Sequence, residues 1–129
     1  MIQKEITICG KQVKLAYCYA TEIGFKLLCD QDINEFILEV GESLNSQPQI
    51  LPDVRKSIML IIAAANAYYE RTKEEGPLKD TDMMYEMSPV ELGMAIGTVL
   101  NMRGEFYKVP SDEPQEKEEP AKKGKKKNA

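Results

Sequence analysis

The side chains best placed to perform chemistry in this 129-residue sequence are three glutamates, Glu35, Glu39 and Glu42, which recur at helical spacing. Carboxylates at this spacing share one face of a helix, where they can bind a cation or transfer protons. A metal site would need further ligands from elsewhere in the chain, and none stands out. A solvated acidic helix face is therefore the simpler interpretation of this cluster.

Other catalytic and metal-binding patterns are missing from the sequence. It contains no histidine, the commonest general base and metal ligand. The three cysteines, Cys9, Cys18 and Cys29, lack C-x-x-C spacing and are odd in number, so they indicate neither a zinc site nor a disulfide framework. No nucleophile elbow, P-loop or nucleotide-binding glycine pattern occurs. The sequence predicts a protein that is not an enzyme and that uses no cofactor or metal.

Charge divides the chain into two parts. The last nineteen residues, Ser111–Ala129, run from an acidic stretch into a lysine-rich one and, prolines aside, have only two apolar side chains, Ala121 and Ala129. Such a segment cannot bury enough surface to offset its ordering entropy, which predicts a disordered tail over 111–129 and a compact domain over 1–110. Residues 1–110 carry 16 acidic and 11 basic side chains, a net charge of −5. This charge argues against a phosphate-binding body, so a nucleic-acid partner is not expected.

The cysteines and the apolar runs bear on the compartment. Free cysteines without a signal peptide indicate a reducing, cytoplasmic environment. The longest apolar run, Ile58–Ala65, is far too short to span a membrane. We therefore expect a cytoplasmic protein with no membrane partner.

Two short strands are expected at the N-terminus, over residues 2–9 and 12–19, with Gly10 and Lys11 between them. Their apolar side chains alternate, and glycine supplies the positive φ that a tight hairpin needs. A two-stranded hairpin is marginal alone, so it must pack on the following helices or pair with another chain. An exposed hairpin edge makes a homo-oligomer plausible.

Four to five packed helices are expected after the hairpin. Residues 21–29 form the first, with Ile23, Leu27 and Leu28 directed inward. The second reaches about Leu44, and its apolar face comprises Ile33, Phe36, Ile37, Val40 and Leu44. The third runs from Pro52 or Asp53 to about Lys73 and is apolar on all sides over 58–65, which predicts a central helix.

The last two helices begin at recognisable caps. Asp80 or Thr81 can cap a short helix, and Ser88-Pro89 fits the start of the final one, with Glu91 at the reciprocal capping site. Gly104 is expected to end that helix. Gly93 and Gly97 indicate close packing on the central helix, or else a subunit contact. The fold class predicted is therefore mainly α (α+β), with an N-terminal hairpin and a C-terminal tail.

This layout resembles a known family. A hairpin of the type KEITICGKQVKLAYCYATEIGFKLL, amphipathic helices and a closing SPVELGMAIGTVLNMRGEFY before a charged tail are similar to tail assembly chaperones of long-tailed bacteriophages and related prophages. The resemblance implies a non-enzymatic protein whose partners are the tape-measure and tail-tube proteins. Many such chaperones also exist in a longer, frameshifted form, and Lys126-Lys127-Asn128 permits a slippery A-AAA-AAC heptamer.

The expected contact surface for such partners is apolar surface at the hairpin or along the second helix, together with a methionine cluster. The candidate contact residues on the second helix and in the methionine cluster are Ile33, Phe36, Ile37, Val40, Met83, Met84 and Met87. Methionine repacks easily and suits an adaptable surface, although plain core filling explains the cluster equally well. The alternative function is a small nucleic-acid-associated regulator, or a generic protein-interaction domain, that uses the lysine-rich tail.

Overall fold

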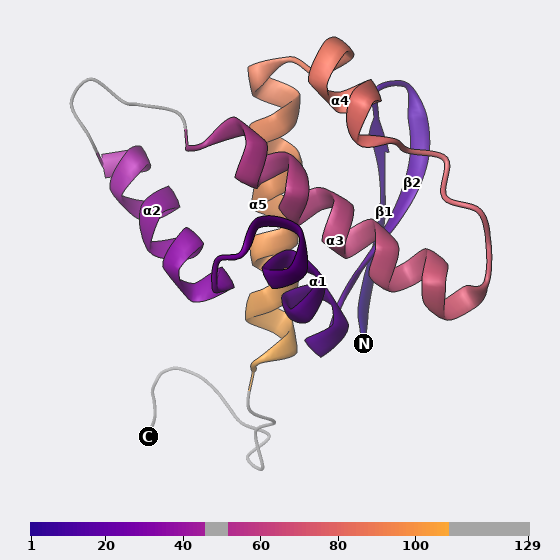
Figure 1. Ribbon diagram of the computed structural model, residues 1–129, viewed down its shortest axis with the longest axis horizontal. Helices are drawn as coiled ribbons and strands as arrows, with labels where there is room; N and C mark the ends of the chain where they lie inside the picture. The colour runs from indigo at the N-terminus through magenta and orange to yellow at the C-terminus, as the bar shows by residue number, and fades with distance from the viewer. Residues whose placement is uncertain (46–51, 109–129) are drawn as a thin grey trace, which may run out of the picture.

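A computed structural model describes residues 1–45 and 52–108 and has a β-hairpin followed by five helices (Figure 1). This confirms the mainly α fold with an N-terminal hairpin. The tail predicted over 111–129 lies outside the described residues. The elements are β1 (Ile2–Ile8), β2 (Lys11–Tyr17), α1 (Tyr19–Cys29), α2 (Ile33–Asn45), α3 (Val54–Thr72), α4 (Asp80–Glu86) and α5 (Pro89–Phe106).

The hairpin closes through a two-residue turn. Ile8 pairs with Lys11, so the turn consists of Cys9 and Gly10, one residue earlier than the sequence suggested. Both have positive φ, 53° and 76°, as a type I′ turn requires to match the twist of the strands. The backbone N–H of Cys9 donates to the carboxylate of Glu91 at 2.9 Å, which fastens the turn to α5.

Helix α3 is the centre of the domain, as its all-round apolar segment predicted. It contacts α1, β2, α4 and α5, and Leu60 and Ile61 are completely buried. Figure 1 shows α3 crossing α5, with α1 in front and the hairpin to one side. Asp53 caps the helix by accepting from the Lys56 N–H at 2.9 Å. Helices α1, α4 and α5 and strand β2 therefore take their positions from the faces of α3.

Helix α1 packs through a different face from the one predicted. Ile23 and Leu27 were expected inward but are 60% and 81% exposed, whereas Phe25 is fully buried. Two contacts set this orientation: the Thr21 hydroxyl donates to the Ala16 carbonyl at 2.8 Å, and Gly24 faces Ala63 of α3. A Cβ built on Gly24 would lie 3.7 Å from the Ala63 Cβ, an ordinary contact, so α1 meets α3 through small residues while Ile23 and Leu27 lie outward.

Helix α5 begins as predicted but otherwise departs from expectation. The Ser88 hydroxyl accepts from the Glu91 N–H at 3.1 Å, while the Glu91 side chain bonds Cys9 instead of its own cap. The helix continues past Gly104 to Phe106. A methyl group built on Gly93 or Gly97 would meet nothing within 4 Å, so the predicted close packing on α3 is wrong.

Replacing Ser88 with alanine should lower the free energy of unfolding by about 0.5–2 kcal/mol, because the Glu91 N–H loses its acceptor. Urea denaturation measures this loss. Thr98→Ala is the matched control, since Thr98 is mid-helix and its hydroxyl donates to the preceding turn at Met94. Equal stability of the two variants would show that the cap contributes nothing.

Candidate interaction surfaces

The predicted contact face of α2 is packed into the domain. Ile33, Phe36 and Val40 are at most 5% exposed, and Ile37 is partly buried against the same core. The Phe36 ring lies 5.4 Å from that of Phe25 between centroids. An apolar helix face has the same sequence pattern whether it binds a partner or its own core, and here the core occupies it.

The methionine cluster is split between core and surface. Met83 is 2% exposed and belongs to the core, while Met87 is partly buried against it. Met84 is 53% exposed. The core-filling alternative therefore describes Met83, and only Met84 of the three lies largely at the surface.

Of the three glutamates on α2, Glu39 forms contacts at the surface. Glu39 accepts from the Gln31 amide at 2.6 Å and pairs with Lys56 at 3.2 Å. These hydrogen bonds, from Gln31 and then Lys56, lower the pKa of the Glu39 carboxyl. Within residues 1–45 and 52–108, no group of three or more histidine, cysteine or acidic side chains is arranged to hold a metal ion.

The cysteines are free and partly buried thiols. Burial raises the pKa of both Cys9 and Cys29, and for Cys9 the nearby Glu91 adds to the effect. A raised pKa keeps these thiols protonated at neutral pH, which makes them weak nucleophiles. Their arrangement therefore favours packing over thiol chemistry.

One polar cluster ties three elements together. The hydroxyls of Tyr17 on β2 and Tyr107 after α5 donate to the Glu22 carboxylate on α1 at 2.8 and 2.7 Å. Arg103 of α5 lies 4.0 Å from the same carboxylate. Burial and then this hydrogen bond raise the pKa of Tyr17, and the hydrogen bond to Glu22 raises the pKa of Tyr107 to about 12. The cluster fixes the end of α5 to α1 and β2.

This cluster predicts a loss of stability at alkaline pH. The folded state keeps both hydroxyls protonated. The stabilisation that results is complete below about pH 10, where tyrosine in the unfolded chain begins to ionise. It is lost as the pH rises through the folded pKa of about 12 for Tyr107. Denaturation curves at increasing pH should show this decline, and Tyr107→Phe should flatten it. If stability declined equally steeply with pH in the Tyr107→Phe variant, the effect could not be assigned to Tyr107.

A stripe of exposed apolar side chains follows the outer face of α1. Tyr19, Ile23 and Leu27 recur every four residues and are 64%, 60% and 81% exposed. We call these three residues the α1 stripe. Tyr19 also packs edge-to-face on Phe106, with the ring centroids 5.2 Å apart, which holds one end of the stripe. The stripe is thus a continuous apolar surface on a helix anchored by its opposite face.

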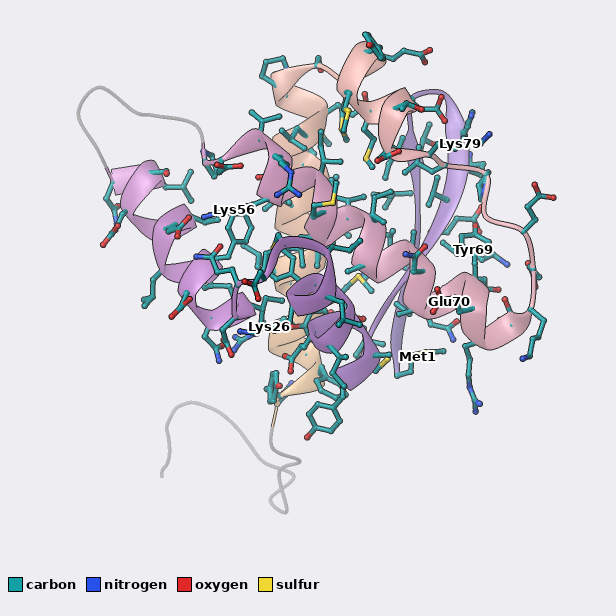
Figure 2. The ribbon with its side chains drawn as sticks, viewed as in Figure 1. Met1, Lys26, Lys56, Tyr69, Glu70 and Lys79 are labelled. Carbon is teal, nitrogen blue, oxygen red and sulfur yellow. The ribbon has the colours of Figure 1, made fainter. Side chains whose placement is uncertain are left out.

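An open groove of about 320 Å³ borders the α1 stripe where α1 meets the start of α2. Lys26, which lines it, lies at this border in Figure 2. The α1 stripe was not predicted from the sequence, where Ile23 and Leu27 were expected to face the core. The signal that could have found it is the competing inward set of Thr21, Phe25 and Leu28, which has the same helical spacing.

Comparison with protein families, with curated proteins and with solved structures finds no match to this chain. In the part of the chain that the structure describes, no helix is both long and apolar enough to cross a membrane.

Proposed function

We propose that this protein is a non-enzymatic assembly chaperone of the kind that long-tailed phages and prophages use, acting in the cytoplasm of the bacterial host. Its partners would be helical segments of the tape-measure protein and the tail-tube protein. The α1 stripe is the observation that supports this proposal, because three large apolar side chains 60–81% exposed form one helix face. Contiguous exposed apolar surface of this kind is typical of binding sites.

The spacing of the α1 stripe fits a helical occupant. Residues four apart lie above one another on a helix, so the stripe forms a ridge that packs between side chains of a second helix. Tape-measure proteins offer long amphipathic helices, whose apolar faces need cover before assembly. A cargo helix with an apolar face would therefore fit the α1 stripe.

The acidic groups beside the α1 stripe indicate what kind of partner helix would bind there. Glu22 and Asp32 line the groove beside the stripe together with a single base, Lys26. The domain as a whole has 16 acidic and 11 basic side chains over residues 1–110. We expect the bound helix to carry lysine or arginine beside its apolar face, which would orient it and accelerate association.

The test is a titration of the full chain with labelled helical peptides from a cognate tape-measure protein, followed by fluorescence anisotropy. Saturable binding by peptides with an apolar face is expected, with no binding by scrambled peptides of equal charge. Absence of binding to every tape-measure peptide would refute the proposal. Deleting residues 121–129 should leave the affinity for these peptides unchanged. The nucleic-acid alternative instead requires that this deletion abolish the binding of nucleic acid.

A further inference from the structure

The two edges of the β-hairpin differ in how their backbone groups are satisfied. Ile8 and Lys11 flank the two-residue turn and form a hydrogen-bonded pair, so bonding pairs alternate along the ladder from there. Gln3, Glu5 and Thr7 therefore direct their backbone N–H and C=O groups away from β2. All three residues are exposed.

Two outward backbone groups of β2 are bonded by side chains of the domain. Tyr69 accepts from the Lys14 N–H at 3.0 Å, and the Thr21 hydroxyl donates to the Ala16 carbonyl at 2.8 Å. Tyr69 is seen beside the hairpin in Figure 2. Across residues 1–45 and 52–108, the outward backbone groups of β1 have no comparable partner. A free strand edge is a template for a further strand.

A groove runs along this free edge between β1 and α5. It consists of two open hollows of about 490 and 470 Å³ that share Ile6 and Thr98, so they are continuous. Val90 and Met94 of α5 line it and are 72% and 70% exposed. An added strand would thus gain backbone hydrogen bonds on one side and apolar cover from α5 on the other. We call this the β1 groove.

We propose that the β1 groove binds β1 of a second copy of this chain, giving a two-fold dimer with a continuous four-stranded antiparallel sheet. Charge and strand length select the register. Because β1 ends at Ile8, centring the two-fold on Thr7 would pair only residues 6–8 of each strand, whereas centring it on Ile6 pairs residues 4–8. Centring the two-fold on Glu5 or on Lys4 would place like charges directly opposite each other, which is destabilising. Centring it on Ile6 pairs Ile6 with Ile6 and Glu5 with Thr7, with no like charges opposed.

The register centred on Ile6 also brings an opposite charge close to Glu91 at the end of the groove. It places Lys4 of the second copy opposite Ile8, near the start of α5, where Glu91 lines the groove. The aliphatic stem of that lysine can cover Met94 while its amine approaches the Glu91 carboxylate. The same contact occurs twice by symmetry, as a closed two-fold interface requires. The surface is therefore complementary to itself, which favours a second copy over a foreign strand.

Sedimentation equilibrium of the full chain tests the dimer. We expect the mass to approach twice the 14.6 kDa of one chain as concentration rises. Glu5→Pro removes an outward N–H that the hairpin does not use, so it should raise the dimer Kd about tenfold or more while far-UV circular dichroism stays unchanged. A chain that stays monomeric at all concentrations would overturn the proposal. This holds even if the monomer binds an unrelated strand peptide at the edge of β1.

A cross-link keeps the proposal testable if the proline variant does not fold. Ile6→Cys puts two cysteines opposite each other at the two-fold, in a non-hydrogen-bonded pair whose Cα separation suits a disulfide. Mild oxidation should convert this variant to a covalent dimer. Gln12→Cys, exposed on β2, is the control and should not cross-link above the wild-type level. Equal cross-linking by the two variants would refute the register.

Discussion

Phe36→Ala is expected to lower the free energy of unfolding by about 3–5 kcal/mol, the range for truncating a buried aromatic side chain. Phe36 is completely buried, and its ring packs on Phe25 with the centroids 5.4 Å apart. It lies between Ile33 and Val40 on the face through which α2 joins the domain. Urea denaturation followed by circular dichroism measures the change.

Leu38→Ala is the matched control for this loss. Leu38 is on the same helix but 69% exposed, so its truncation should change the free energy of unfolding by less than about 0.5 kcal/mol. The pair also separates a core role of Phe36 from the partner contact that the sequence suggested. A Phe36→Ala variant with unchanged stability and lost partner binding would restore the contact interpretation.

The elements of this fold were predictable from the sequence because each has a local signal. Alternation marked the strands, and the all-round apolar segment marked α3 as the central helix. The orientation of α1 was not predictable in this way. Its apolar residues fit two overlapping helical stripes, one through Ile23 and Leu27 and one through Phe25 and Leu28. The choice between them depends on Gly24 against Ala63, a contact made across the fold.

The candidate surfaces were harder to predict because they depend on distant partners. The cap at Ser88 was identified correctly, yet the Glu91 side chain bonds Cys9, 82 residues away in the sequence. Local spacing contains no information on that contact. The face of α2 shows the same limit. Its sequence pattern predicted an apolar helix face but not that this face would be buried in the core.

The double substitution Ile23→Glu with Leu27→Glu should weaken binding of a tape-measure helix by about a hundredfold or more, since it places two charges in an apolar contact. This prediction depends on the proposed function. Both side chains are 60% or more exposed, so the free energy of unfolding should change little. The acidic charges would also be expelled from a helix-binding ridge because burying them unpaired is costly. Fluorescence anisotropy with the wild-type peptide gives the affinity ratio.

Tyr85→Glu is the control for general effects of adding negative charge. Tyr85 is 87% exposed on α4 and lines neither the groove beside the α1 stripe nor the β1 groove, so its substitution should leave helix binding and dimer formation intact. The α1 double variant should still dimerise, because the β1 groove lies along a different element. If both variants weakened helix binding equally, net charge would govern the association, and the α1 stripe would not be the binding site.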